Sequence, residues 1–201
     1  MIAGRETMEY KHHAVQRLLL PEQIHQRVRE LASEIRCEYA DKHPVLVGVL
    51  KGAFVFLADL VRELQFPLQC DFVKLSSYGG STETSGQVRL ELDVSIPLAG
   101  RHVLVVEDIV DTGLTTAWLL AHLRKKQPAS LRVCALLDKP ARRRVEVLID
   151  FVGFRIPDQF VVGYGIDWAE AYRELDFIGY IPPQKSSRCG RFDVSAAEEI
   201  P

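Results

Sequence analysis

The stretch from Val103 to Thr116, with the sequence VLVVEDIVDTGLTT, predicts a buried strand, a loop and the start of a helix. Its first four residues are apolar throughout, as expected of a strand that is covered on both faces. The adjacent carboxylates of Glu107 and Asp108 follow, and a third, Asp111, comes three residues later. Ligands bind at the carboxyl ends of strands in open parallel sheets, so these acids are candidates for a binding site.

Small polar residues separate Asp111 from a helix expected over residues 115–126. Backbone N–H groups and hydroxyls of residues 112–115 would point inward at the helix N-terminus, which suits a dianionic phosphate. Acids beside such a site suit sugar hydroxyls, a hydrated Mg²⁺ or a developing positive charge. The alternative is a solvated acidic turn with a threonine N-cap. The position between a buried strand and a helix start favours the binding site.

Strands and helices alternate through the middle of the chain, which predicts an α/β fold with a mostly parallel sheet and helices on both faces. The later part is rich in strands and is expected to form an edge or a hood. Strands are expected at 15–20, 45–50, 71–77, 88–94, 103–106, 131–137, 161–166 and 177–181, and helices from 21 and over 53–64.

The chain has 201 residues, which favours one domain, expected over residues 1–183 with a hood from the N-terminal segment and about 150–181. Residues 184–201 lack periodicity and are expected to be a disordered tail. The net charge of −2 argues against general nucleic-acid binding. No apolar run is long enough to cross a membrane.

The four cysteines, Cys37, Cys70, Cys134 and Cys189, are far apart and form no Cys-x-x-Cys motif. A metal-thiolate site or a disulfide framework is therefore not expected in a chain of this size. The first residues also lack the apolar core of a secretory signal. These features predict reduced thiols and a cytoplasmic location.

Asp111-Thr112-Gly113 also matches the Asp-Thr-Gly signature of aspartic proteases, in which two such loops share one proton. This chain has a single copy, so a protease would need a dimer. The helix that follows and the alternation of strands and helices do not fit a small all-β protease.

Residues 107–115, EDIVDTGLT, resemble the signature of the type I phosphoribosyltransferases: two acids, two apolar residues and Asp-Thr-Gly-x-Thr. The resemblance covers about residues 15–181 and is strongest to the hypoxanthine-guanine phosphoribosyltransferases. It implies a central, mostly parallel sheet flanked by helices, with a small hood. It also implies a Mg²⁺-dependent transfer of the phosphoribosyl group from phosphoribosyl pyrophosphate to a 6-oxopurine.

The resemblance assigns the pyrophosphate to Lys51, Gly52 and Arg173, with a non-proline cis peptide before the glycine. Ser77 and Tyr78, with the Gly/Ser/Thr-rich run after them, resemble the mobile loop that closes over the reacting centre. Such closure would exclude water from a cationic sugar transition state.

The base pocket is implied by two later segments, Asp138-Lys139-Pro140 and residues 154–167, FRIPDQFVVGYGID. In the family the lysine, here Lys139, donates to O6 of the purine. Phe160 would stack on the purine, and the backbone of Val161 would hydrogen-bond to its edge. Asp167 would hold a second Mg²⁺ through water or lie near the purine.

Glu107 and Asp108 would orient the ribose and the metal, and Asp111 would be the general base that takes the proton from N7. Leu114 would contribute only its backbone N–H to the phosphate. The set implied for the 5′-phosphate is Asp111, Thr112, Gly113, Leu114, Thr115 and Thr116. Members of the family form dimers and tetramers, so a homo-oligomer is expected by analogy.

A second class of function remains open at this point. Some proteins of this fold are regulators that keep the phosphoribosyl pyrophosphate loop and bind RNA or DNA. The run Arg142-Arg143-Arg144 could serve such a role, although a solvated surface is the simpler interpretation. The full set of catalytic-type residues, Asp111 included, favours the enzyme over a regulator and over an inactive relative.

Overall fold

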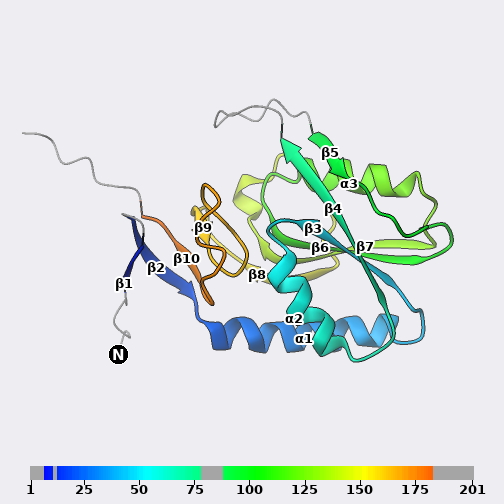
Figure 1. The fold of residues 1–201 in the computed structure, drawn as a ribbon, viewed down its shortest axis with the longest axis horizontal. Coiled ribbons are helices and arrows are strands. Elements are labelled where there is room, and N and C mark those ends of the chain that lie inside the picture. The colour runs from blue at the N-terminus through cyan, green and yellow to red at the C-terminus, as the bar shows by residue number, and fades with distance from the viewer. Residues whose placement is uncertain (1–6, 11–12, 78–87, 183–201) are drawn as a thin grey trace, which may run out of the picture.

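The computed structural model describes residues 7–10, 13–77 and 88–182, which form a six-stranded sheet with flanking helices and a separate four-stranded sheet (Figure 1). The strands are β1 (Thr7–Tyr10), β2 (His13–Leu19), β3 (Val45–Leu50), β4 (Gln69–Ser77), β5 (Val88–Leu92), β6 (His102–Val110), β7 (Ser130–Asp138), β8 (Phe151–Arg155), β9 (Val161–Val162) and β10 (Ile178–Tyr180). The helices are α1 (Pro21–Tyr39), α2 (Phe54–Leu64), α3 (Leu114–Arg124) and the short 3₁₀ helix η1 (Pro140–Arg142).

The large sheet has the strand order β5-β4-β3-β6-β7-β8. All neighbours pair in parallel except β5, which returns antiparallel to β4. The smaller sheet, with the order β1-β2-β10-β9, is antiparallel throughout and lies beside one end of the large sheet (Figure 1). The expected fold class, a mostly parallel sheet with a hood, is confirmed.

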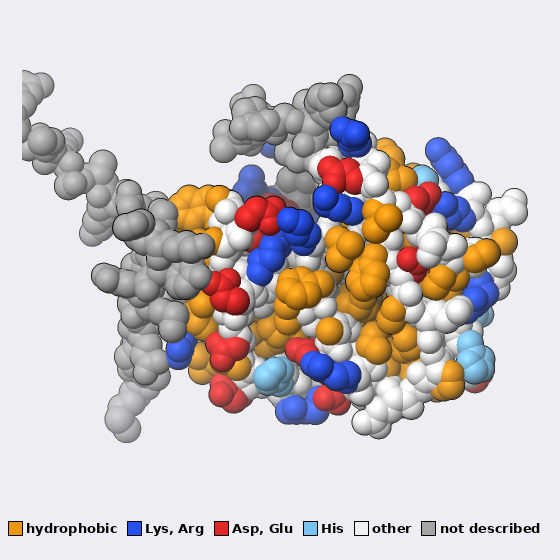
Figure 2. All heavy atoms as spheres, in the orientation of Figure 1, with side chains coloured by type: hydrophobic (Ala, Val, Ile, Leu, Met, Phe, Trp, Pro, Cys, Tyr) orange, Lys and Arg blue, Asp and Glu red, His pale blue; other side chains and the backbone are white. Residues whose placement is uncertain are grey.

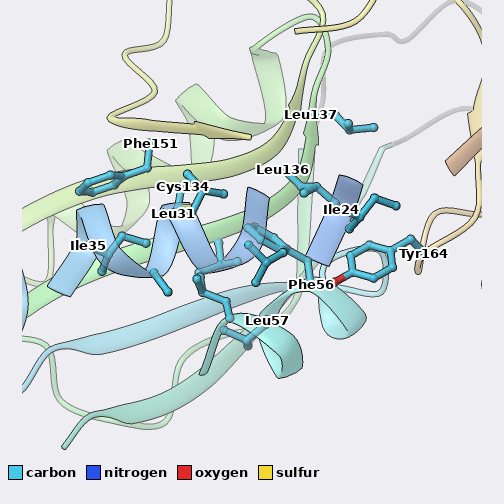
Figure 3. Close-up of a cluster of buried hydrophobic side chains, with 14 of the residues drawn as sticks. Ile24, Leu31, Ile35, Phe56, Leu57, Cys134, Leu136, Leu137, Phe151 and Tyr164 are labelled. Atoms are coloured by element: carbon cyan, nitrogen blue, oxygen red, sulfur yellow. The ribbon is translucent and has the colours of Figure 1, made fainter. Parts of the chain in front are cut away.

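Alternate residues of the central strands face two separate apolar cores, because successive side chains of a strand point to opposite faces. Leu46 and Leu104 face α1 and α2, whereas Val47 and Val105 face α3. Figure 3 shows side chains of α1, α2, β7 and β8 interlocking in the first of these cores. Strands β3 and β6 are buried along most of their length because helices cover both faces of the sheet.

Helix α1 links the hood strand β2 to the main body and is fixed through contacts in its first two turns. Pro21 occupies the first turn, where a missing N–H costs nothing, and Gln23 accepts a hydrogen bond from the N–H of Leu20 at 2.8 Å. The guanidinium of Arg27 donates to the carbonyls of Val152 and Gly153 at 2.8 and 3.1 Å. These two hydrogen bonds of Arg27 tie the helix to the edge strand β8.

Three expectations about the elements need correction. Strand β6 continues to Val110 and therefore includes the acids that were expected to follow it. Strand β9 ends at Val162, because the next three residues, 163–165, have left-handed backbones that turn the chain. Strand β8 belongs to the large sheet, where it pairs with β7 and packs against α1. The C-terminal part of the hood therefore begins at β9 and not near residue 150.

Two further expectations fall on residues that the structure does not describe. Tyr78 and the Gly/Ser/Thr-rich run up to residue 87 are among them, as is the tail at 184–201. Within the described ranges, none of the helices combines the length and the apolar character needed to cross a membrane.

Candidate active site

Strands β3, β6 and β7 are parallel neighbours, so the loops that follow them meet at one edge of the large sheet. Lys51 follows β3, Asp111 follows β6 and Lys139 follows β7. The backbone N–H of Lys139 donates to the carbonyl of Val110 at 3.0 Å, which holds two of these strand ends together. The fold therefore gathers three separate candidate segments in one place.

Gly52 lies directly against Asp108. A Cβ added to Gly52 would stand 1.8 Å from Asp108 Oδ2, so only glycine fits there. A Cβ on Gly165 would stand 2.4 Å from the carbonyl oxygen of Gly52, so the loop after β9 also touches this turn. The cis peptide bond joins Leu50 to Lys51, one bond earlier than the bond directly before the glycine.

The acidic pair at the end of β6 is held in an unfavourable environment for charge. Glu107 is only 4% exposed, and Thr116 Oγ1 donates to its Oε1 at 3.3 Å. Burial, and then the charge of Asp108, raise the pKa of Glu107 well above its usual value. Burial also raises the pKa of Asp108 to about 6, although two backbone N–H groups and Arg173 favour its charged form.

The loop expected to bind the 5′-phosphate, residues 111–115 (the phosphate loop), leads into the start of α3, where Thr112 Oγ1 accepts a long hydrogen bond of 3.4 Å from the N–H of Leu114. Gly113 is the N-cap of α3 with φ +81°, and the first turn carries no acid. Arg144 and Val145 donate their backbone N–H groups to the carbonyl of Thr112 at 2.9 and 3.1 Å, which fixes the loop from its other side. This arrangement leaves the positive end of the helix facing the site, as anion binding requires.

Asp111 keeps unused hydrogen-bonding capacity. Its Oδ1 is buried and accepts no hydrogen bond, although Arg142 Nε lies 3.4 Å away. A buried carboxylate oxygen without a donor is rare in proteins. The general-base role expected for Asp111 stays a prediction.

The residues expected to bind a purine lie together on the hood side of this edge. Lys139 is 4% exposed, and burial lowers the pKa of its ammonium group. Phe160 is 52% exposed and meets Trp168 edge to face, with 5.8 Å between ring centroids. Val161 is buried in β9, where it pairs with Tyr180. An exposed aromatic ring and a buried lysine are groups that can bind a flat, polar heterocycle.

Asp167 and Arg173 form an ion pair with 2.8 Å between Oδ1 and Nη2. Arg173 also donates to the carbonyl of Gly165 at 2.7 Å. Glu170 lies between the two expected pyrophosphate cations: its Oε2 is 2.8 Å from Lys51 Nζ and 3.5 Å from Arg173 Nη2. Sequence reasoning missed Glu170, for which the only signal is its place three residues before Arg173.

Two arginines of the 142–144 run form ion pairs with acids near the site, although Arg142 and Arg144 are exposed as expected and only Arg143 is largely buried. Arg142 lies 3.4 Å from Asp111 and 3.8 Å from Asp158. Arg143 pairs with the buried carboxylate of Asp138, the residue directly before Lys139. On the face drawn in Figure 2, basic and acidic side chains are likewise interspersed.

Ser77 is the last residue of β4, and the expected lid residue Tyr78 lies outside the described ranges. Among the residues that are described, no group of three or more His, Cys, Asp and Glu side chains could hold a metal ion. Glu107 and Asp108 therefore fit a Mg²⁺ ion only if oxygen atoms of a ligand complete its coordination. A pair of buried carboxylates with raised pKa values would gain from such a cation.

Comparisons with known proteins agree with this geometry. Residues 17–168 match the family described as phosphoribosyl transferase domain. A hypoxanthine-guanine phosphoribosyltransferase of Bacillus subtilis is 44% identical over 86% of this chain and 96% of its own length. One from Mycobacterium avium is 49% identical over 83% of this chain and 85% of its own length. A crystal structure of the Bacillus anthracis enzyme of that name superposes with a TM-score of 0.80, at 44% identity, over 88% of this chain and all of the other.

Proposed function

This chain belongs to the phosphoribosyltransferase family, and we propose that it is a hypoxanthine-guanine phosphoribosyltransferase of purine salvage. The reaction joins N9 of a 6-oxopurine to C1 of the ribose 5-phosphate unit of phosphoribosyl pyrophosphate. The C1–O bond breaks, pyrophosphate leaves, and a nucleoside monophosphate forms. The observation that carries the proposal is the pair formed by the buried Glu107 and the partly buried Asp108, which lies beside the N-terminus of α3 at one sheet edge.

The phosphate loop holds the 5′-phosphate at the start of α3, where backbone N–H groups and the helix dipole favour a dianion. Lys51, Gly52 and Arg173 hold the pyrophosphate on the other side of Asp108. The two anionic ends of the substrate are thereby anchored, and the ribose between them lies over the acidic pair. This placement orients C1 for attack.

Glu107 and Asp108 face the ribose, where positive charge develops as the C1–O bond lengthens. Two carboxylates in a protein interior stabilise such a charge more strongly than in water. A bound Mg²⁺ ion would supply neutralisation of the leaving pyrophosphate and a grip on the ribose hydroxyls. The raised pKa values of both acids indicate that the free site favours a positively charged ligand.

Asp111 acts as the general base and takes the proton from N7 as N9 attacks. Its Oδ1 accepts no hydrogen bond within the protein, although it lies 3.4 Å from Arg142 Nε in an ion pair. Lys139 donates to O6, and Phe160 stacks on the ring. Because O6 is common to hypoxanthine, guanine and xanthine, these residues select 6-oxopurines as a class.

A spectrophotometric assay tests the function. It contains phosphoribosyl pyrophosphate and Mg²⁺, with hypoxanthine, guanine, xanthine, adenine and uracil offered separately. We expect turnover of hypoxanthine or guanine that EDTA abolishes, and no turnover of uracil. If no base is converted while phosphoribosyl pyrophosphate still binds, the regulator of the same fold becomes the better interpretation, and RNA binding is then measured.

Two further properties belong to this proposal. A homo-oligomer is expected from the family, and sedimentation or light scattering of the purified chain would measure it. The cysteines in the described ranges, Cys37, Cys70 and Cys134, are all unpaired thiols, which is typical of a reducing compartment such as the cytoplasm.

A further inference from the structure

Glu170 is an acidic residue that contacts the two cations expected to bind pyrophosphate, Lys51 and Arg173. Its Oε2 lies 2.8 Å from Lys51 Nζ and 3.5 Å from Arg173 Nη2, so one oxygen atom touches both expected pyrophosphate cations. A pyrophosphate oxygen would make the same two contacts. The carboxylate thus occupies the place of the ligand.

The position of Glu170 is built into a tight turn. The backbone N–H of Glu170 donates to Asp167 Oδ2 at 2.9 Å. Trp168 and Ala171 exchange two backbone hydrogen bonds of 3.1 Å each across the turn. Ala169 and Glu170 have φ values of +50° and +63°, a left-handed conformation that non-glycine residues rarely adopt. Surrounding contacts therefore impose this backbone and direct the carboxylate to the cations.

The turn is also fixed relative to the pyrophosphate loop. The carbonyl of Gly165 accepts a hydrogen bond from Arg173 Nη1 at 2.7 Å, and Gly165 packs on the carbonyl of Gly52. The side chain of Glu170 is 68% exposed, however, and that of Lys51 is 50% exposed. An exposed ion pair is weak and can exchange its anion for a more highly charged one.

We propose that Glu170 is an internal competitor at the pyrophosphate subsite, which neutralises Lys51 and Arg173 when the subsite is empty and yields to pyrophosphate when it binds. The inference rests on the proposed function, because the assignment of the subsite comes from it. Glu170 weakens the binding of both pyrophosphate-bearing ligands, phosphoribosyl pyrophosphate and pyrophosphate itself. It also aids product release, since the carboxylate returns to the two cations as pyrophosphate departs.

The test compares Glu170→Gln with the wild type. Isothermal titration with pyrophosphate and Mg²⁺ should give a Kd that is roughly threefold to tenfold lower in the variant, the range expected for removing one exposed ion pair, with Lys51, and one partly exposed ion pair, with Arg173. The KM for phosphoribosyl pyrophosphate should fall by a similar factor. The Kd of GMP should not change, because this nucleotide carries no pyrophosphate group. The differences should shrink at 1 M salt, where charges are screened beyond about 3 Å.

Glu30→Gln is the matched control, because Glu30 is an exposed acid on α1 that pairs with Arg27 at 3.0 Å. It removes the same charge and a similar ion pair away from the site, and it should leave the Kd of pyrophosphate unchanged. Glu170→Gly is a second variant, which removes the carboxylate and also relieves the left-handed backbone. It should reproduce the effect of Glu170→Gln on pyrophosphate.

An unchanged or higher Kd for pyrophosphate in Glu170→Gln overturns the inference, as does an equal shift in the Kd of GMP. Either result could occur while the wild type converts hypoxanthine, in which case the proposed function stands. If the wild type converts no purine but Glu170→Gln still tightens pyrophosphate binding, the competitor role stands and the proposed reaction fails.

Discussion

The contact between Gly52 and Asp108 leads to a quantitative prediction for Gly52→Ala. The added methyl group would start 1.8 Å from Asp108 Oδ2 and 2.4 Å from its Cγ, whereas ordinary van der Waals contact begins near 3.4 Å. The carboxylate or the Lys51-Gly52 turn must therefore move by about 1.6 Å. Both groups belong to the proposed site, so either movement displaces a catalytic part.

A misplacement of about 1 Å in a catalytic site can reduce the rate on the order of 100-fold, which corresponds to about 2.7 kcal/mol of transition-state stabilisation. We therefore expect Gly52→Ala to lower kcat on the order of 100-fold. The main cost should fall on activity, because a carboxylate at the edge of the sheet can retreat without opening the apolar core.

Gly48→Ala provides the matched control, in strand β3 just before the Lys51-Gly52 turn. Its Cβ would also be crowded, at 2.7 Å from Leu57 Cδ2, but that atom is the tip of a flexible side chain in the core. We expect this variant to lower the Tm through overpacking and to keep kcat within about twofold. The assay is steady-state turnover of hypoxanthine with thermal unfolding measured in parallel. The reasoning is wrong if Gly52→Ala retains kcat within about threefold of the wild type, or if both variants lose activity equally.

Three other substitutions test the site. Asp111→Asn should reduce turnover strongly while the Kd of GMP stays near the wild-type value; wild-type turnover would remove Asp111 as the base. Phe160→Ala should raise the KM of the purine roughly tenfold, since stacking of a base on an aromatic ring contributes about 1–3 kcal/mol, and should barely change the Tm because the ring is half exposed. Asp108→Asn should abolish most activity yet stabilise the free protein at pH 7.5. The folded pKa of Asp108, about 6, exceeds its usual value of 3.8, so ionisation destabilises the fold as the pH rises between these values. The free energy of unfolding of the variant should exceed that of the wild type by about 1–3 kcal/mol at pH 7.5, and this difference should vanish below pH 4. Urea unfolding at pH 7.5 and at a pH below 4 measures the difference. An equal difference at the two pH values would show that the charge of Asp108 is not its cause.

Local pattern was sufficient for most of the framework. The apolar runs at 45–50 and 103–106 predicted central strands, and both are buried between helices on two faces. The acids before Asp-Thr-Gly predicted a ligand site next to a helix start, and α3 begins at Leu114, directly after this loop. These features depend on neighbours within a few residues, which a sequence displays directly.

Partnerships across long stretches of chain could not be predicted in this way. Glu170 reads as a surface acid, and its contact with Lys51 spans 119 residues of sequence. The run of arginines at 142–144 reads as a solvated face, yet Arg142 reaches Asp111 and Arg143 pairs with Asp138. The place of β8 also depended on packing, because a short strand carries no mark of the sheet it joins.

Residue types at fixed spacings along the chain identify the groups that can carry the chemistry: the acidic pair, the phosphate loop, the cations and the aromatic ring. The contacts that each of these groups makes follow from the folded arrangement and not from the spacings. Burial sets the pKa of Asp108, and the approach of Gly52 and Gly165 sets the shape of the subsite beside it. The physical reason is that charge and steric fit depend on distances in space, and parallel strand order brings together residues that the chain separates widely.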